Sequence, residues 1–419
     1  MNNPFEHDAI ARSGASSPSA LAASGLQCGW RAAAQRVAAI AAQYADAVDH
    51  DARFPAEAVD ALRHERLLSA MVPEAYGGAG LGVVEIGAIC ETLAQACAST
   101  AMIYAMHQIE IACMSKYGSS LPWQRALLGK VVERQLLLAS ATSEENIGGS
   151  LRTSSCAVEL DGARFRIEKL APTISYGANA DGILVTARRT PESPPGDQVL
   201  IVVLKADTLL EKRGEWDSMG MRGTCSEGFR LVATGVEQQI LPAPFSEIAD
   251  QTMLPLSHTL WASVWTGVAS DAVNRASAFF RAQARSKSGP FPASGARLAE
   301  AVGLLRMMQA RLVAGLETAQ HAHATVDDAC SADTPLSAIL GFATDMNTLK
   351  ISISSTALKV VQEVLMICGM AGYKNGTQYS VGRHLRDLYS APLMISNDRI
   401  AQNTANLLAV QRSAVLGAT

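Results

Sequence analysis

The chain has 419 residues, a formal net charge of −4 and a 48% share of hydrophobic residues. This length predicts two or three domains, and the near-neutral charge without a recurring basic stripe argues against nucleic acid as a partner. The eight cysteines are scattered without a CxxC pair, and no secretory signal or apolar run of about 18 residues is found. We therefore expect a cytoplasmic protein with reduced thiols, no metal site and no contact with a membrane.

The N-terminal third has the pattern of a helical domain. Residues 1–25 are rich in Ala, Ser, Gly and Asn, and we expect a flexible leader there. Apolar residues at helical spacing then predict helices over Trp30–Ala47, Ala56–His64, Val84–Ala98, Ser99–Tyr117 and Pro122–Val132. These helices predict an α-helical domain over residues 26–138.

The middle of the chain has a different pattern. A hydroxyl-rich turn over residues 139–150 introduces short runs that alternate or are β-branched, bounded by Gly, Asp or Asn. They predict strands at Ser154–Val158, Ala163–Glu168, Gly182–Ala187, Val199–Lys205, Gly228–Leu231 and Gln238–Ile240. We expect a barrel-like or sandwich-like β domain over residues 139–250.

The rest of the chain returns to helical spacing. Long patterns predict helices over Ser257–Ser286, Ala296–Val326, Pro335–Gly369 and Asp398–Val415. Short connections between long helices favour an antiparallel four-helix bundle over residues 251–419. The expected fold class is therefore multidomain α+β, with a helical domain, a β domain and a four-helix bundle in that order.

Five local sequences occur in an order that resembles the acyl-CoA dehydrogenase family of flavoproteins, over about residues 30–415. They are Pro73–Gly80, Ala141–Glu144, Lys169–Ala180, Met219–Thr224, and Gly369–Tyr373 with Arg386-Asp387. The resemblance implies a FAD cofactor between the β domain and the bundle. It also implies a homodimer or homotetramer, because a second subunit completes the cofactor site in that family.

The flavin-facing turn is the part of the resemblance that the residues themselves support. Backbone N–H groups and hydroxyls at Ala141, Thr142 and Ser143, with the hydroxyl of Ser175, suit the hydrogen-bonding edge of an isoalloxazine ring. Taken singly, each of these residues is equally an ordinary polar turn residue.

The second subunit's contribution follows from the resemblance alone. It implies Arg285 as a ligand of the cofactor pyrophosphate, for which a guanidinium fork is well suited. It also places Gly369 and Asn397 at the cofactor. Met366 and Met370 depart from the family pattern, because a glutamine and a glycine are usual there.

The family's usual catalytic glutamate is missing. Its position next to the last helix corresponds to Ile395, and the alternative position on the first bundle helix falls in Leu256–Thr259, which has no carboxylate. Two displaced bases are candidates. A histidine with an ordinary pKa can act as a base at neutral pH, so His258 is one candidate, although it is also read as a partly buried structural histidine. Asp398 follows three residues after Ile395, although it is also a typical cap of a helix.

The predicted function is FAD-dependent α,β-dehydrogenation of an acyl thioester, carried by coenzyme A or an acyl-carrier protein, with an electron-transfer partner or oxygen as acceptor. The alternative is a monooxygenase of the same superfamily that uses reduced flavin and oxygen, with His107 as a proton donor. An inactive thioester binder is a third interpretation, and a helical scaffold without enzymatic activity a fourth. Two interpretations are open for Met102, Met106 and Met114: they line a tunnel for the acyl chain, or they belong to the hydrophobic core.

Overall fold

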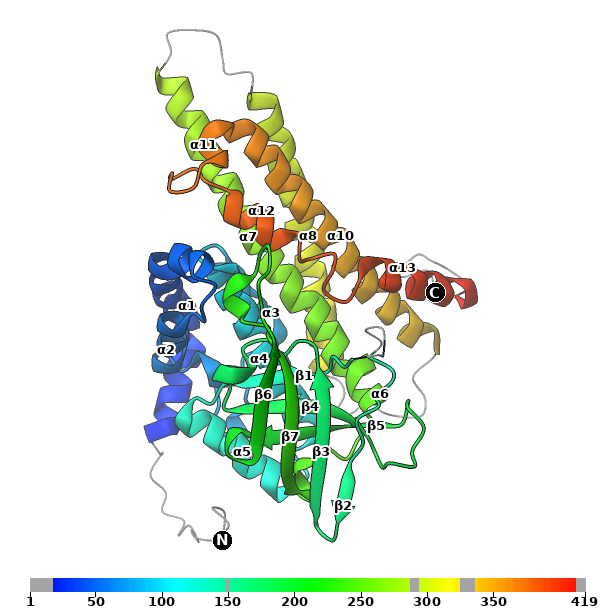
Figure 1. The fold of residues 1–419 in the computed structure, drawn as a ribbon. Helices are drawn as coiled ribbons and strands as arrows, with labels where there is room; N and C mark the ends of the chain where they lie inside the picture. The colour runs from blue at the N-terminus through cyan, green and yellow to red at the C-terminus, as the bar shows by residue number, and fades with distance from the viewer. Residues whose placement is uncertain (1–17, 146, 148–150, 287–293, 325–335, 412–419) are drawn as a thin grey trace.

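The computed structural model describes residues 18–145, 147, 151–286, 294–324 and 336–411 (Figure 1). Three regions follow one another along the chain. Helices come first, two small β-sheets follow, and a group of long helices ends the chain. This order confirms the predicted fold class. The predicted domain boundaries stay predictions, because one continuous hydrophobic core extends through all three regions.

Five α-helices build the first region: α1 (Pro18–His50), α2 (Ala56–His64), α3 (Val83–Ala94), α4 (Ala98–Tyr117) and α5 (Pro122–Arg134). α1 begins inside the stretch predicted to be a leader, because its first residues are Ala-rich and a proline is tolerated in a first turn; residues 1–17 lie outside the described part of the chain. α4 contacts α3, α7 and the first strand, so it is buried on nearly all faces.

Two sheets form the middle region. The first contains β1 (Leu138–Ala141), β4 (Gly182–Arg188) and β5 (Gln198–Leu204), in the order β1-β4-β5 with β1 parallel to β4. The second is antiparallel, in the order β2-β3-β7-β6, and contains β2 (Glu159–Asp161), β3 (Arg164–Ala171), β7 (Gly228–Val236) and β6 (Thr208–Gly214). β4 and β5 are buried on both faces, which explains their unbroken apolar sequences.

The prediction of a strand at Ser154–Val158 was wrong. The backbone N–H groups of Ser155 and Cys156 donate to the Glu144 carboxylate at 2.9 and 2.8 Å, instead of joining a sheet. Only one isolated bridge, between Ala157 and Arg188, forms in this segment.

The prediction of a strand at Gln238–Ile240 was also wrong, because Glu237–Gln239 is a 3₁₀ helix. Its first turn is capped by the Gln239 side chain, whose Oε1 accepts a hydrogen bond from the backbone N–H of Val236. β1, β2 and β6 were not predicted. The sequence of β1, Leu-Ala-Ser-Ala, contains no β-branched residue, so it has no strong strand signal.

The last region is built on three long helices. A short α6 (Phe245–Ile248) and a π-helical turn (Ala249–Met253) continue without a break into α7 (Leu254–Ser286). α7 packs against α8 (Gly295–Ala324) and α10 (Leu336–Cys368), as Figure 1 shows. The chain ends with α11 (Met370–Tyr373), α12 (Gly382–Leu388) and α13 (Asn397–Val410). The fourth bundle helix, α13, is shorter than predicted and lies against α10.

One helix, α10, is long and apolar enough over Ser337–Cys368 to cross a membrane, with a mean hydropathy of 1.4. In the structure it packs against α7, α8 and α13. Asp345 and Lys350 lie within this stretch and are buried. These contacts are typical of the core helix of a bundle.

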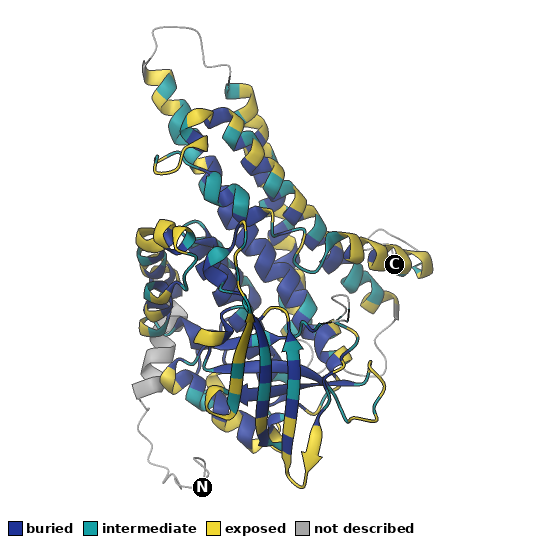
Figure 2. Cartoon of the chain, in the orientation of Figure 1, coloured by how far each residue is buried: buried dark blue, intermediate teal, exposed yellow. Residues whose placement is uncertain are grey.

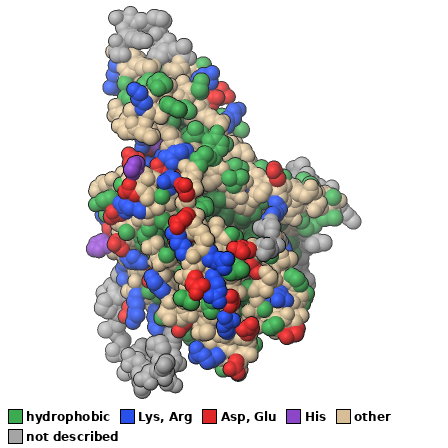
Figure 3. All heavy atoms as spheres, viewed as in Figure 1, with side chains coloured by type: hydrophobic (Ala, Val, Ile, Leu, Met, Phe, Trp, Pro, Cys, Tyr) green, Lys and Arg blue, Asp and Glu red, His purple; other side chains and the backbone are tan. Residues whose placement is uncertain are grey.

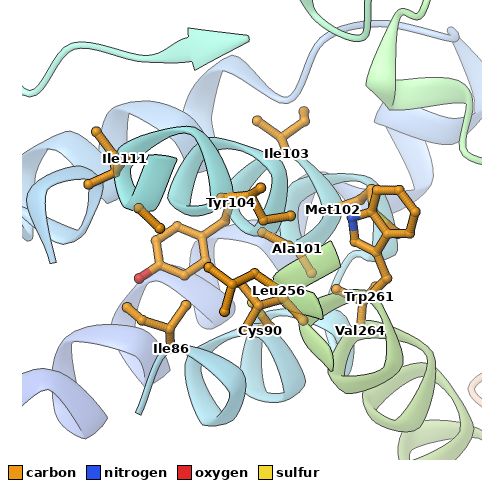
Figure 4. Close-up of a cluster of buried hydrophobic side chains, with 14 of the residues drawn as sticks. Ile86, Cys90, Ala101, Met102, Ile103, Tyr104, Ile111, Leu256, Trp261 and Val264 are labelled. Atoms are coloured by element: carbon orange, nitrogen blue, oxygen red, sulfur yellow. The ribbon is translucent and has the colours of Figure 1, made fainter. Parts of the chain in front are cut away.

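Burial is deepest where the three regions meet (Figure 2). At this junction Met102 of α4 lies beside Trp261 of α7, and the ring of Tyr104 points toward Ile86 of α3 (Figure 4). On the surface, the exposed face of the second sheet carries both signs of charge side by side (Figure 3), as in the ion pairs Arg166–Glu168 and Arg230–Glu211. A pocket lined by residues of α4, β1 and α7 opens beside this junction.

Candidate functional site

A pocket of about 140 Å³ lies between α4, the end of β1, the start of α7 and the loop before α13. Its lining combines hydroxyl side chains, one carboxyl group and apolar side chains. The lining side chains are Met106, Ile109, Glu110, Ser140, Thr142, Ser143, Leu151, Thr173, Ser175, Met253, Leu254, Ser257, Trp261 and Ile395.

Two buried side chains fix β1 against α4. The backbone N–H of Leu138 donates to His107 Nδ1 at 3.0 Å, and the Tyr176 hydroxyl donates to the Leu138 carbonyl at 2.9 Å. His107 donates through Nε2 to the Leu68 carbonyl at 2.6 Å. Burial lowers the pKa of His107 to about 4, so the ring is neutral and both of its nitrogens are occupied. This bracing places Ser140 and the turn after β1 at the pocket.

The hydroxyls of the lining come from two segments. Ser143 Oγ donates to the Thr173 carbonyl at 2.7 Å, which joins the turn after β1 to the turn after β3. Ser175 Oγ lies 2.8 Å from Ser226 Oγ. The predicted residues Thr142, Ser143 and Ser175 therefore line one pocket, and Ala141 is buried behind them at the end of β1.

Two polar side-chain atoms of residues that line this pocket lack a partner. Within the described part of the chain, neither Glu110 Oε2 nor Trp261 Nε1 makes a hydrogen bond, although both atoms are buried. Burying a polar atom without a partner is unfavourable, so such atoms point to a ligand. With the hydroxyls and the apolar surface of Leu254 in the same lining, these residues fit a planar heteroaromatic ring with hydrogen-bonding edges, such as a flavin.

Glu144, at the end of the flavin-like turn, has a structural role. It accepts hydrogen bonds from Ser154 Oγ at 2.7 Å and from Lys169 Nζ at 3.2 Å, and Lys169 also donates to the Thr186 carbonyl at 2.8 Å. Burial alone would raise the pKa of Glu144, but Lys169 and the hydroxyl hydrogen bonds outweigh it and leave that pKa below its usual value. The pair holds the turn onto the sheet.

A buried lysine organises the loop that carries Ile395. Lys350 Nζ on α10 donates to the carbonyls of Ala391 and Ile395 at 3.0 and 3.1 Å and to Asn397 Oδ1 at 2.7 Å. Ile395 has φ +45°, which a β-branched residue rarely adopts. The lysine thus fixes a strained loop that presents Ile395 to the pocket.

The two predicted bases lie elsewhere. His258 is on α7 beside Ser257, yet its ring is next to Lys350 and Met346 of α10 rather than in the pocket lining. Burial, with the Lys350 cation, lowers its pKa to about 3. Asp398 is exposed in the first turn of α13, where the helix dipole favours a carboxylate. Their roles as bases stay predictions.

The predicted second-subunit residues lie at a distance from this pocket within the same chain. Arg285 is at the far end of α7, about 40 Å along the helix axis from Ser257 at 1.5 Å per residue. Gly369 ends α10 with φ +53° and is exposed, and Figure 1 shows this end of the bundle away from the sheets. Asn397, by contrast, is engaged with Lys350 and Ser354.

Two of the family-like motifs meet each other rather than the pocket. Met221 N donates to Asp387 Oδ1 at 2.6 Å, and Arg386 donates to the Met219 carbonyl at 2.9 Å and pairs with Asp49 of α1. Burial raises the pKa of Asp387 to about 6. These contacts join the helical region, the sheets and α12.

A larger cavity of about 1290 Å³ lies between α1, α7 and α12. The arginines in its lining form ion pairs with aspartates: Arg222–Asp217, Arg275–Asp271, Arg383–Asp46 and Arg386–Asp49. Because these charges are compensated, the smaller pocket is the better functional site. The described residues contain no group of three His, Cys, Asp or Glu side chains placed to hold a metal ion.

Sequence reasoning missed Glu110. The available signal was one carboxylate between Ile109 and Ile111 in a helix that is otherwise apolar. Of the three methionines considered for an acyl tunnel, only Met106 lines the pocket, while Met102 and Met114 are buried core.

The chain was compared with known proteins. Residues 27–131 match the family model described as acyl-CoA dehydrogenase, N-terminal domain. Among relatives, cyclohex-1-ene-1-carbonyl-CoA dehydrogenase of Geobacter metallireducens is 31% identical over 42% of this chain and 47% of its own length. The enzyme of the same name from Syntrophus aciditrophicus is 24% identical over 85% of this chain and 82% of its own length. The chain thus spans about half of the first relative and most of the second.

Solved structures share the fold. FMN-bound TdsC from Paenibacillus sp. A11-2 superposes with a TM-score of 0.77 and 19% identity, covering 90% of this chain and 96% of that one. Butyryl-CoA dehydrogenase from Megasphaera elsdenii superposes with a TM-score of 0.74 and 20% identity, covering 92% and 98%. Residues 27–131 thus match the N-terminal domain of the acyl-CoA dehydrogenase family, and the sequence relatives and the shared fold support the chain as a member of that family.

Proposed function

We propose that the protein is a flavin-dependent oxidoreductase that removes two hydrogens from adjacent carbons of an acyl-CoA thioester. The observation that carries this proposal is the pocket, whose lining brings the hydroxyls of Thr142, Ser143 and Ser175 together with Glu110 and apolar side chains. The hydroxyl side would hold the flavin ring, and the side formed by α4 and α7 would hold the acyl group. When bound, the flavin supplies the hydride acceptor.

Both sequence relatives named above are dehydrogenases of a cyclic acyl-CoA, which supports a carbon–carbon bond next to a thioester as the reacting group. Met106, Met253 and Leu254 give the pocket the apolar lining that an acyl group needs. We infer a coenzyme A thioester of a cyclic acid as the substrate class.

Anaerobic mixing tests the proposal. Flavin-loaded protein is combined with a panel of straight-chain and cyclic acyl-CoA thioesters, and the visible absorbance of the flavin is followed. We expect bleaching with at least one thioester, because a hydride acceptor that gains two electrons loses this absorbance. Coenzyme A alone is the control and should leave the spectrum unchanged.

A monooxygenase is the second candidate, and one observation favours it. The chain superposes on TdsC, a dibenzothiophene monooxygenase, slightly better than on butyryl-CoA dehydrogenase. His107, the proton donor predicted for that reaction, has both ring nitrogens hydrogen bonded. Absence of bleaching, followed by oxygen-dependent hydroxylation after chemical reduction of the flavin, would favour this candidate. Absence of both reactions would leave a thioester binder.

We infer FAD rather than FMN, with the adenine half held by a second copy of the chain. Arg285 and Gly369 are exposed at the far end of the bundle, and Met366, Met370 and Tyr373 form an exposed apolar group beside them. Apolar side chains gathered at one site favour an interface, here of a homodimer or homotetramer. Light scattering after gel filtration measures the oligomeric state.

The Arg285→Ala variant should bind FAD about 10- to 100-fold more weakly, because a hydrogen bond to a charged group contributes about 1.5 to 3 kcal/mol. FMN affinity should not change. Arg281→Ala is the matched control, since Arg281 is also exposed and lies one helical turn earlier. Equal FAD affinity in both variants, or FMN as the cofactor that copurifies with the protein, would contradict the inference.

A further inference from the structure

We propose that Glu110 is the catalytic base of this pocket and takes the proton from the carbon next to the thioester carbonyl; this rests on the function proposed above. Among the described residues that line the pocket, Glu110 is the only one with an ionisable side chain.

The helix places Glu110 correctly for this role. Met106, Ile109 and Glu110 are spaced so that they share one face of α4, and all three line the pocket. Ser257 and Trp261, one turn apart on α7, line the opposite side. A substrate held between the two helices therefore lies against the carboxyl group.

A purely structural role does not explain the contacts of Glu110. A buried carboxyl that stabilises a fold is usually paired with a cation or accepts hydrogen bonds at both oxygens. Glu110 is 2% exposed, and its Oε2 has no partner in the described structure. The side chain of Ser140 hydrogen bonds to the carboxyl group and favours its charged form. The free oxygen is left available to a ligand.

The neighbouring titratable groups leave Glu110 as the one that ionises near neutral pH. Burial raises its pKa to about 8, offset in part by Ser140. On α4 itself, burial holds the pKa of Cys113 well above its usual value and lowers that of His107 to about 4. From the segment after β3, Tyr176 has a pKa raised well above its usual range by burial. α7 and the loop at Ile395 contribute no ionisable side chain to the pocket lining that is described.

The proton balance is simple. The C–H bond next to the carbonyl breaks, the proton forms an O–H bond on Glu110, and the electron pair stays on the substrate to form the carbon–carbon double bond. The hydrogen on the neighbouring carbon leaves as hydride to the flavin, which is the oxidant. Because Glu110 must be ionised first, the rate should rise with pH through about 8.

Rapid-mixing kinetics of Glu110→Gln test the proposal. We expect flavin reduction by the thioester to slow by about 100-fold or more, the range of general-base catalysis, with little change in thioester affinity. Glu110→Asp should restore part of the rate. Glu91→Gln is the matched control, because Glu91 is a largely buried carboxyl on α3 that also touches α7, through Ser270, but does not line the pocket. Its rate should equal that of the unmodified protein.

His258→Ala and Asp398→Asn are tested in the same way, because sequence reasoning predicts these two residues as bases. If Glu110 is the base, both variants keep at least a tenth of the rate. A large loss in either variant, with Glu110→Gln close to normal, would overturn the proposal.

Proton exchange gives a readout that does not depend on flavin reduction. In D₂O, the protein should incorporate deuterium next to the carbonyl of a bound thioester, and Glu110→Gln should lose this exchange while retaining bound flavin and thermal stability.

An infrared difference spectrum between pH 6.5 and 9.5 should show a carboxylic acid band that Glu110→Gln lacks. If the unmodified protein does not bleach but exchanges, the proposed dehydrogenation fails while the base stands. If it bleaches and Glu110→Gln is unaffected, the base is wrong.

Discussion

Replacement of Lys169 by methionine is expected to lower the free energy of unfolding by about 3 to 5 kcal/mol, because it leaves Glu144 as a buried charge without its partner. The Lys169 side chain is fully buried and that of Glu144 is 5% exposed. The carboxylate would still accept from Ser154 and Ser155, but the Thr186 carbonyl would also lose its donor. Urea unfolding followed by circular dichroism measures the change.

Two controls sharpen this test. Lys212→Met removes an exposed lysine that pairs with Glu215 and Glu227, and should change stability little. The double variant Glu144→Leu with Lys169→Met should be more stable than Lys169→Met alone, since no unpaired charge is buried. A small loss in Lys169→Met, equal to that in Lys212→Met, would show that the pair does not stabilise the turn. Because the pKa of Glu144 is lowered in the folded state, its contribution should disappear as the pH falls through that pKa.

Gly220→Ala is expected to lower the free energy of unfolding by about 1 to 3 kcal/mol or more, since a Cβ there has no room. It would lie 2.1 Å from the Arg386 carbonyl oxygen, a backbone atom that cannot rotate away. The change should also separate Met221 N from Asp387. Thermal unfolding and limited proteolysis of the segment before α13 provide the measurements.

Gly303→Ala is the matched control for this site. A Cβ at Gly303 on α8 meets nothing within 4 Å, and alanine favours a helix, so this variant should be at least as stable as the unmodified protein. Equal stability of the two variants would contradict the close approach of the Met219–Thr224 turn to α12.

The functional argument depends on residues whose proximity arises only from packing. Ile395 and Glu110 are far apart in the sequence, yet both line one pocket, and Lys350 fixes the loop that carries Ile395 against α10. Replacing the family's carboxylate by Ile395 leaves that side of the pocket apolar. The carboxylate from α4 then becomes the natural proton acceptor, a proposal that the Glu110 variants test.

His258 shows why a sequence position alone does not decide a role. Ser257 and His258 are neighbours in the chain, but successive residues of an α-helix point about 100° apart around its axis. Ser257 therefore lines the pocket, while His258 lies beside Lys350 and Met346 of α10. The register of α7 against α10 decides between the two, and hydrophobic periodicity is too coarse to give it.

The sequence by itself determined the order of helices and sheets, the bounds of α2, α7, α8 and α10 to within three residues, and the hydroxyls of the turn after β1. These features follow from local periodicity and turn chemistry, which depend on neighbours in the chain. Only the tertiary structure decided that the backbone N–H groups of Ser155 and Cys156 donate to the Glu144 carboxylate instead of to a neighbouring strand. The same holds for Glu110, whose Oε2 has no hydrogen-bond partner within the described residues. The physical reason is that hydrogen-bond satisfaction and burial of a charge depend on segments far away in the sequence.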